Sequence, residues 1–323
     1  MVSRLWYMNA DFEVELSQPV GTAYRRLPSF DALNHRLAPR LLWLARAGDV
    51  LLLRKPWSDD LKSEAQQRGV ELVSPEHSTR LTTHLFTPWG WTPSAVAAGR
   101  QSGAVVSQQI PFETVARVNS KVWSHSLEVE LGWAQRGAAT ASTFDELQEA
   151  VTRASPGTDD KWVIKSPFGF AARDRVLGRG PSLEGPQAKW CERRLSNGET
   201  LLFQPWLEVI REYGIVMEIS SDGAYEIHGI SDLRTNGAGT GKGYILGRPP
   251  APHRLIELES IAGIVTRRLF KEGYFGPVGI DALEHSRGLL PLLEINARYT
   301  MGFVAVAVQK HLKPSSPFFW SLN

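Results

Sequence analysis

Apolar and polar stretches alternate in two different rhythms along the chain. Up to about residue 110, short apolar runs at residues 5–8, 50–53 and 70–73 are separated by more polar stretches, such as the helix-like residues 61–68. This alternation is typical of an α/β layer built on a parallel sheet. Proline and glycine residues interrupt the pattern between residues 84 and 111, and we expect the first unit to end there.

From residue 112 onward, helices alternate with strands that lie close together in sequence. A helix is expected over residues 112–127, and STFDELQEAV begins another, because a hydroxyl group caps free N–H groups and acidic residues favour the first turn. A loop rich in glycine and arginine is expected over residues 166–180. Further helices are expected near residues 183–195 and 253–272, and strands at residues 161–165, 200–204, 213–219, 224–231, 277–283 and 289–295.

Length and composition exclude several classes of protein. At 323 residues the chain exceeds the size at which single hydrophobic cores stop growing, so two or three packed units are expected. Its 42% hydrophobic and 22% charged residues are ordinary for a globular protein and unlike those of a disordered one. The net charge of +2, from 36 basic and 34 acidic residues, is not that of a general nucleic-acid binder.

The cysteine content and the lack of long apolar segments bear on the compartment. The single cysteine, Cys191, excludes an internal disulfide and fits a reducing compartment, so we expect a cytoplasmic protein with an inert thiol. No stretch approaches the ~18 to 20 apolar residues that span a bilayer, and the N-terminus is interpreted as a first strand rather than a secretory signal. We therefore expect no membrane or nucleic-acid partner, and a homodimer as the commonest oligomer.

Two apolar strands near the C-terminus end in oxygen-bearing side chains. The segments GYFGPVGIDALE and LLPLLEINARYTMG are separated by a short turn, which predicts a β-hairpin that brings Asp281 close to Glu294. Asn296 lies two residues after Glu294 and therefore on the same face of its strand. Two carboxylates and an amide oxygen suit Mg²⁺, which leaves room for substrate phosphates. The alternative is a solvated hairpin with unrelated acids.

With this hairpin the chain resembles the ATP-grasp superfamily, in which an Asp on one strand and a Glu-x-Asn on the next hold two magnesium ions against the β and γ phosphates of ATP. The resemblance covers about residues 115–305. It implies two α+β lobes that sandwich ATP, preceded by a Rossmann-like α/β domain. The domains would be residues 1–111, 112–200 and 201–323.

The same resemblance implies roles for the residues of the hairpin. Asp281, Glu294 and Asn296 would be the magnesium ligands. Arg298, in Asn-Ala-Arg, would meet the phosphate or the acyl-phosphate, since a guanidinium is a bidentate donor suited to both. The alternative for Arg298 is a salt bridge to an inward-facing glutamate.

Two lysines have a spacing similar to that of the phosphate-contacting lysines of D-alanine:D-alanine ligases. Lys165 ends an apolar strand just before a loop, where its ammonium group can meet a phosphate. Lys121 lies on a helix face, and for it a solvated role stays open. The loop after Lys165 contains one glycine where the family's phosphate loop is rich in glycine and serine, so we expect Arg173 or Arg175 to supply charge. Gly279 replaces the arginine of that branch, which argues against D-alanine as the substrate.

The segment TLLFQPWLEVIREYGI resembles the hinge between the two lobes of the family. The backbone from Gln204 to Leu207 would then hydrogen-bond the edge of adenine. Glu212 would hold the ribose hydroxyls, or Glu208 if the hinge turns differently.

The segment GAGTGKG is not a Walker A motif, because Asn236 and Gly243 stand where that motif requires a glycine and a Ser or Thr. We interpret it as part of a mobile lid, with Arg234 and Lys242 as candidate contacts to substrate or phosphate. Solvation of both side chains at the surface is the alternative.

The resemblance implies a Mg-ATP-dependent ligase for amino-acid or peptide-like substrates. The γ-phosphoryl group would pass to a carboxylate, and an amine would then attack the acyl-phosphate. The protein would act by positioning and electrostatic stabilisation. Two alternatives stay open: a phosphotransferase that releases the phosphorylated acceptor, and a nucleotide-binding protein without catalysis.

Overall fold

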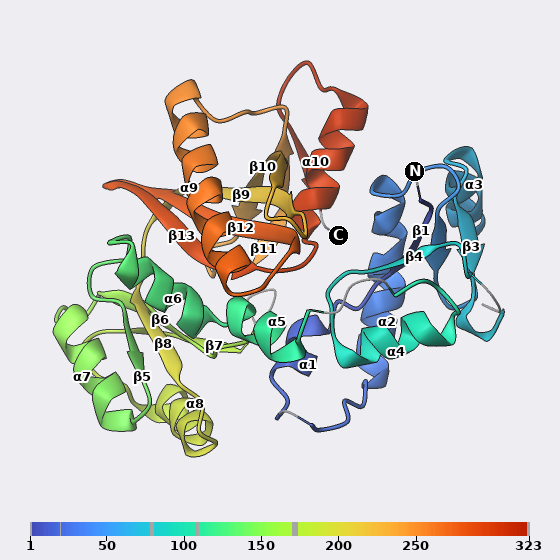
Figure 1. Cartoon of the computed structure of the whole chain (residues 1–323). Coiled ribbons are helices and arrows are strands. Elements are labelled where there is room, and N and C mark those ends of the chain that lie inside the picture. The colour runs from blue at the N-terminus through green and yellow to red at the C-terminus, as the bar shows by residue number, and fades with distance from the viewer. Residues whose placement is uncertain (1, 20, 78–80, 107–109, 170–173, 322–323) are drawn as a thin grey trace.

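The chain is built around three β-sheets, which Figure 1 shows in the computed structural model. The structure describes residues 2–19, 21–77, 81–106, 110–169 and 174–321. The first sheet belongs to the N-terminal part, the second to the middle of the chain, and the third and largest to the C-terminal part. None of the helices in these ranges is long and apolar enough to cross a membrane.

The N-terminal sheet has four parallel strands in the order β3-β2-β1-β4. This confirms the predicted parallel α/β unit, since the three apolar runs supply its first three strands. The stretch for which the sequence predicted only a boundary also holds β4 and α4, because Pro88 ends the strand and Pro93 opens the helix, where a missing N–H costs least. The elements are β1 (Arg4–Tyr7), α1 (Phe12–Leu16), α2 (Pro28–Leu37), η1 (Ala38–Trp43), β2 (Val50–Leu52), α3 (Asp59–Gln67), β3 (Glu71–Val73), η2 (Pro75–His77), β4 (Leu85–Pro88) and α4 (Pro93–Gln101).

The middle sheet is antiparallel, in the order β5-β8-β6-β7. The predicted cap is confirmed at Thr143, which forms a reciprocal capping box with Glu146. The prediction of a loop over residues 166–180 is wrong in its second half, because β7 pairs with β6 although its own sequence carries no apolar alternation. The elements are β5 (Ala139–Ala141), α7 (Phe144–Ala154), β6 (Lys161–Lys165), β7 (Arg175–Arg179), α8 (Gly185–Ser196) and β8 (Leu201–Pro205).

Two helices replace the single helix that we predicted over residues 112–127. α5 (Phe112–Asn119) and α6 (Lys121–Glu130) are separated at Ser120, whose backbone is extended at φ −72° and ψ 129°. The backbone N–H of Lys121 donates to the carbonyl oxygen of Pro167 at 3.0 Å instead of continuing a helix. A contact to a distant loop therefore sets the break, and no local sequence signal marks it.

The C-terminal sheet has six strands in the order β13-β12-β9-β10-β11-β14. The glycine-rich segment that we interpreted as a lid is partly strand, since residues 241–246 form β11. Only residues 236–240, which form the turn between β10 and β11, lie outside the strands. The elements are β9 (Val209–Ile219), β10 (Tyr225–Thr235), β11 (Gly241–Leu246), α9 (Pro252–Lys271), β12 (Gly276–His285), β13 (Gly288–Asn296), α10 (Met301–Leu312) and β14 (Phe318–Ser321).

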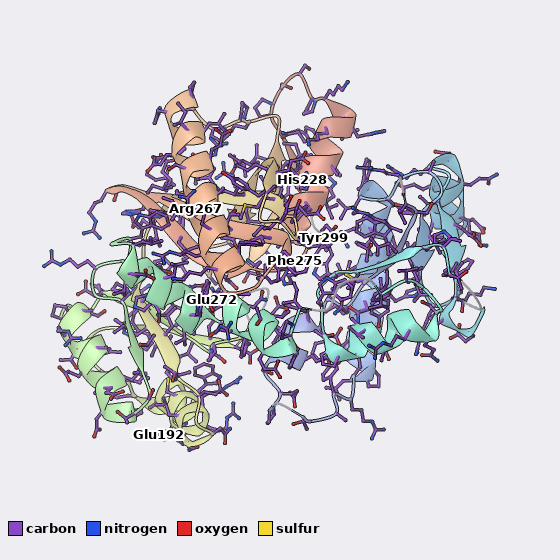
Figure 2. All side chains as sticks on the ribbon, in the orientation of Figure 1. Glu192, His228, Arg267, Glu272, Phe275 and Tyr299 are labelled. Atoms are coloured by element: carbon purple, nitrogen blue, oxygen red, sulfur yellow. The ribbon has the colours of Figure 1, made fainter. Side chains whose placement is uncertain are left out.

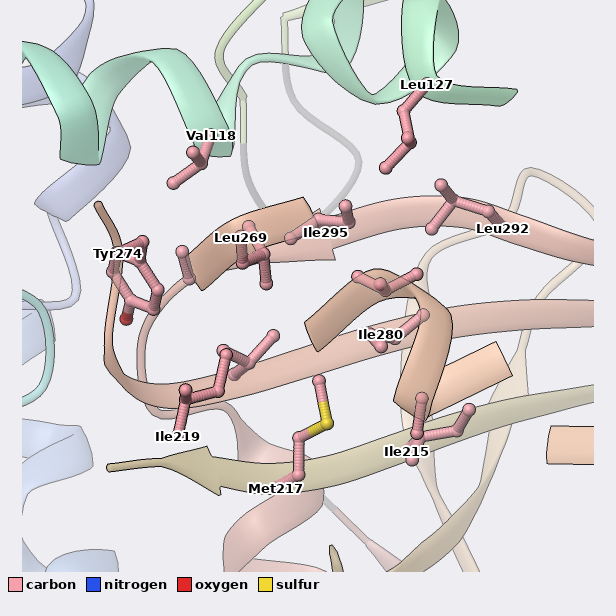
Figure 3. Packing of buried hydrophobic residues seen from close by; sticks show 14 of the residues in the cluster. Val118, Leu127, Ile215, Met217, Ile219, Leu269, Tyr274, Ile280, Leu292 and Ile295 are labelled. Carbon is pink, nitrogen blue, oxygen red and sulfur yellow. The ribbon is translucent and has the colours of Figure 1, made fainter. Parts of the chain in front are cut away.

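Helices α5, α6 and α9 bury one face of the C-terminal sheet. Figure 3 shows Val118 of α5 and Leu127 of α6 facing Leu292 and Ile295 of β13, and all four side chains are buried. Burying side chains of this size contributes roughly 1.5–3 kcal/mol each. This packing holds the start of α6, and with it Lys121, beside the edge strand β13.

Helix α10 lies against the opposite face of the same sheet, and the N-terminal part packs beside it, with η1 in contact with α10. Tyr299, labelled in Figure 2, lies at this junction, where its ring meets Trp6 edge-on at 5.3 Å and its hydroxyl accepts a hydrogen bond from Arg4 at 3.3 Å. The predicted domain limits at residues 111 and 200 stay predictions. The pairing of β8 with the middle sheet favours a second boundary between Pro205 and Val209.

Candidate active site

The β12–β13 hairpin brings the three predicted metal ligands together. Asp281 is paired with Glu294 in the strand register, and Asn296 lies opposite Gly279. The Nδ2 atom of Asn296 donates to Oδ2 of Asp281 at 3.1 Å. Side chains alternate over the last three residues of β13, so that Glu294 and Asn296 line a cavity while Ile295 lies in the core.

The hairpin carries more negative charge than its surroundings stabilise. Burial raises the pKa of Asp281 well above its usual value, and the carboxylates of Glu294 and Glu212 raise it further. Among the described residues, no group of three or more His, Cys, Asp or Glu side chains is close enough to hold a metal ion, so any site here consists of two carboxylates and an amide. Such hard oxygen donors fit Mg²⁺, and a cation would relieve the repulsion between the acids.

Two lysines face this hairpin from the middle part of the chain. The Nζ atom of Lys121 lies 2.9 Å from Oε1 of Glu294 and also donates to the carbonyl oxygen of Gly169 at 2.9 Å. Burial by itself would raise the pKa of Glu294, but Lys121, with Lys165 and Arg298 nearby, lowers it below the usual value. Glu294 is therefore held as a carboxylate.

Among the described residues, Lys165 is a cation without a salt-bridge partner. It ends β6, is partly buried, and forms no salt bridge or hydrogen bond through its ammonium group within the described ranges. Burial lowers its pKa to about 8, against the opposing effect of Glu294. A buried, unpaired ammonium group is costly, and the phosphate of a ligand would compensate it.

A cavity of about 660 Å³ lies between the hairpin and the lysines. Gly214 and Gly279 leave room at its floor, since a Cβ atom on Gly214 would lie 2.5 Å from Oγ of Ser231, and one on Gly279 2.7 Å from Cγ2 of Thr300. The charged residues and the amide in its lining come from the hairpin and from both neighbouring parts of the chain: Glu13, Arg36, Lys121, Lys165, Asp174, Arg175, Glu212, Asp281, Glu294, Asn296 and Arg298.

A second cavity of about 410 Å³ adjoins the first, because Lys165, Arg175 and Glu212 line both. The predicted hinge residues Gln204 and Leu207 line this second cavity. The Nε2 atom of Gln204 is buried and has no hydrogen-bond partner among the residues described. A ligand acceptor atom would satisfy this donor, as buried polar groups normally are satisfied.

Of the two candidates for the ribose contact, Glu212 has the more suitable position. It lies where the two cavities meet, whereas Glu208 lines only the second. Burial raises the pKa of Glu212 to about 7, and the positive charges of Lys165 and Arg175 oppose this shift.

The chain resembles known proteins in its three-dimensional structure and not in its sequence. No protein-family model and no curated protein sequence matches the chain. N5-carboxyaminoimidazole ribonucleotide synthetase from Thermus thermophilus matches with a TM-score of 0.53 and 17% identity, over 87% of this chain and 78% of that one.

Two further structures match over almost the whole chain. The biotin carboxylase domain of 2-oxoglutarate carboxylase from Hydrogenobacter thermophilus has a TM-score of 0.58 and 10% identity, and the match covers 99% of this chain and 72% of that one. The L-amino acid ligase from Bacillus licheniformis has a TM-score of 0.51 and 12% identity, with 97% and 75% covered. The chain has the ATP-grasp fold. The expectation of two lobes behind a parallel N-terminal α/β unit is thereby confirmed.

Within this ATP-grasp fold, Arg298 forms the salt bridge that was the alternative in the sequence, and its contact with a phosphate or acyl-phosphate stays a prediction. Its Nη2 atom donates to Oδ1 of Asn296 at 2.9 Å, at the predicted metal site. Its Nε atom donates to Oε1 of Glu13 at 2.7 Å, and a second contact to the same oxygen forms the salt bridge. Arg298 thus links the hairpin to the N-terminal part.

The other basic residues that the sequence analysis proposed as ligand contacts do not all line the two cavities. Arg234 lines the second cavity, and Lys242 is exposed and lines neither. Arg173 lies outside the described residues. Arg175 lines both cavities, and one of its Nη atoms donates to the carbonyl oxygen of Ala238 in the β10–β11 turn.

Sequence reasoning missed the charged residues that the N-terminal part contributes to the cavity, and the structure fits the inert cysteine that it expected. Glu13 and Arg36 line the cavity from α1 and α2, and no motif singled them out. Glu13 is one of three acidic residues in the segment after β1, and nothing in the sequence separates it from the other two. Cys191 is buried, and burial raises the pKa of its thiol to about 12, which fits the inert role expected.

Proposed function

We propose that the protein is a Mg-ATP-dependent ligase that activates a carboxylate as an acyl-phosphate and joins it to an amine. The observation that carries the proposal is Lys165, a partly buried cation without a described partner that lines a cavity together with two carboxylates. A phosphate chain together with a divalent cation would neutralise both sides of this cavity at once. Neither group alone would do so.

The arrangement of the two cavities supports ATP as the nucleotide. Gln204, Leu207 and Glu212 would bind the adenosine part in the smaller cavity, and Lys121, Lys165 and the hairpin acids would face the phosphates in the larger one. Among the similar structures, the biotin carboxylase domain is described as a complex with MgADP, ADP and bicarbonate. A further N5-carboxyaminoimidazole ribonucleotide synthetase is described as an ADP complex.

The residues of this chain have distinct roles in the proposed reaction. Bound Mg²⁺ would neutralise charge on the phosphates, with Asp281, Glu294 and Asn296 as its protein ligands and two ions as the expected number. Lys165 would hold the γ-phosphoryl group while a carboxylate oxygen forms a bond to its phosphorus and the bond to the bridging β–γ oxygen breaks, which releases ADP. Arg298 would then hold the acyl-phosphate. The amine nitrogen would form a bond to the acyl carbon, and the C–O bond to phosphate would break, which releases inorganic phosphate.

The proposal extends to the compartment and the oligomeric state of the enzyme. We infer a cytoplasmic protein that acts on small molecules, as its unpaired, buried cysteine supports. A homodimer is the oligomeric state to test first, by light scattering.

A screen for coupled products tests the proposed reaction. Purified protein would receive Mg²⁺, γ-labelled ATP and pairs of amino acids or small peptides, and inorganic phosphate and product mass would be followed. We expect phosphate release that requires both an acid and an amine. Label retained on the acceptor would instead indicate a phosphotransferase. No increase of the melting temperature with Mg-ATP would refute nucleotide binding itself, because a ligand of the folded state must stabilise it.

A further inference from the structure

The larger cavity continues past the hairpin into the N-terminal part of the chain. Ala10 and Glu13 follow β1, Trp89 follows β4, and Leu33 and Leu37 line the cavity from α2. Ala10, Glu13 and Trp89 thus come from segments that follow the carboxyl ends of parallel strands, where open α/β sheets bind ligands. This end of the cavity is separate from the one that the nucleotide would occupy.

The wall at this end is apolar and partly accessible. Leu33 and Leu37 lie one turn apart on α2 and are only partly buried, as is Met301 at the start of α10. The ring of Trp89 is buried beside them in the same core cluster. A partly exposed apolar wall inside a cavity favours the side chain of an apolar ligand.

Two side chains of opposite charge, Glu13 and Arg36, line the same end of the cavity, and each can still bind a ligand group. Both contacts from Arg298 reach Oε1 of Glu13, and no described residue donates a hydrogen bond to Oε2. Glu13 lines the cavity with 7% of its surface exposed, so that Oε2 remains available to a ligand donor. Arg36 on α2 is exposed and forms no salt bridge with any described residue.

We propose that this end of the cavity is the subsite for the amine, and that the amine is an α-amino acid with an apolar side chain. The inference rests on the proposed ligase function. The ammonium group binds Oε2 of Glu13, the carboxylate binds Arg36, and the side chain packs on Leu33 and Leu37. Because Glu13 also holds Arg298, the amine is bound next to the group that would hold the acyl-phosphate.

Binding measurements with three related ligands test the subsite without knowledge of the carboxylate substrate. L-leucine carries both charges, isoamylamine lacks its carboxylate, and 4-methylpentanoate lacks its amine. Calorimetric titration in the presence of Mg²⁺ and a non-hydrolysable ATP analogue would give the three affinities. We expect leucine to bind best and each analogue about 10- to 100-fold more weakly, the value of one charge-assisted hydrogen bond.

Two variants assign the two charges. Arg36→Met should reduce the affinity for leucine to that for isoamylamine and leave isoamylamine unchanged. Glu13→Gln, which can still accept a hydrogen bond from Arg298, should remove the preference of leucine over 4-methylpentanoate. Arg25→Met is the matched control, since Arg25 is exposed in the same part of the chain and lines neither cavity of the site.

The outcomes separate the subsite from the ligase function. The subsite proposal is wrong if leucine does not bind. It is also wrong if Arg36→Met weakens the binding of leucine and of isoamylamine equally. This second test does not use the Glu13→Gln variant, so it remains valid even if that variant folds poorly. ATP-dependent ligation of other amines without leucine binding would overturn the subsite alone. Leucine binding with the predicted discrimination, but no ATP-dependent reaction with any acid, would overturn the ligase function and leave the subsite.

Discussion

Lys165 offers the most direct test of the nucleotide site. Its side chain is partly buried at the end of β6, its ammonium group has no described partner, and the phosphate of the proposed ligand would supply one. Replacement by methionine keeps the apolar part of the side chain and removes the charge. Lys165→Met should therefore stabilise the free protein and weaken ATP binding, two effects of opposite direction.

The pKa of Lys165 sets the size of the first effect. Burial lowers this pKa from 10.5 to about 8, a difference of about 2.5 pKa units. At about 1.36 kcal/mol per unit, the charged side chain costs the folded state at most about 3.4 kcal/mol. Water in the cavity reduces this cost, and we expect a gain of about 1–3 kcal/mol for Lys165→Met at pH 7.

The direction of the pH dependence follows from the same shift. Between pH 8 and pH 10.5 the unfolded chain holds the lysine proton while the folded chain has lost it. The unfolded state then binds more protons, so the stability contributed by Lys165 rises with pH across this window. The advantage of Lys165→Met is thus complete below about pH 8 and disappears toward pH 10.5.

Urea unfolding at pH 7 and pH 10, with calorimetric titration of a non-hydrolysable ATP analogue, measures both effects. Loss of a charge-assisted hydrogen bond to phosphate should weaken nucleotide binding about 10- to 100-fold. Lys189→Met on α8 is the control, because Lys189 is exposed and should change neither quantity. A Lys165→Met protein that is less stable at pH 7, or that binds the analogue as tightly as wild type, would refute the reasoning.

Three further predictions concern the hairpin and its neighbours. Asp281→Asn and Glu294→Gln should each reduce Mg-dependent ADP release by about 100-fold or more, since metal ligands supply several kcal/mol of charge stabilisation; near wild-type rates across a Mg²⁺ titration would exclude them as ligands. Between pH 6 and pH 8, nucleotide affinity should rise in wild type as Glu212 ionises near its raised pKa of about 7, and Glu212→Gln should lack this rise in calorimetric titrations; an identical profile would contradict the ribose contact. Arg298→Met should destabilise the protein by about 3–5 kcal/mol in urea unfolding by leaving Glu13 buried and unpaired, and adding Glu13→Gln should recover part of the loss; simple additivity would argue against the pair.

Local sequence was sufficient to recognise the hairpin and the face shared by Glu294 and Asn296, which Ile295 leaves for the core. It did not set the full register. The turn pairs Leu283 with Leu290, and an irregularity between Asp281 and Leu283 then shifts the pairing so that Asp281 lies opposite Glu294. The strand that ends at Lys165 was likewise predicted with its observed limits, because a short apolar run bounded by polar residues needs no distant partner to be recognised.

Elements without an apolar pattern could not be predicted. β7 is a strand because β6 lies beside it, and the break at Ser120 exists because Lys121 bonds to Pro167. Neither fact has a local signal. The consequence for the site is direct, since the break places Lys121 at the first residue of α6, within reach of Glu294.

By itself, the sequence determined which side chains share a face, which strands are neighbours in the hairpin, and hence the acidic cluster of the site. Only the tertiary structure decided how that cluster is completed. Glu13 and Arg298 are 285 residues apart in the chain and meet because the N-terminal part packs against the C-terminal sheet. Periodicity records the direction of a side chain relative to its own strand or helix, whereas contacts between distant elements depend on how whole surfaces fit together.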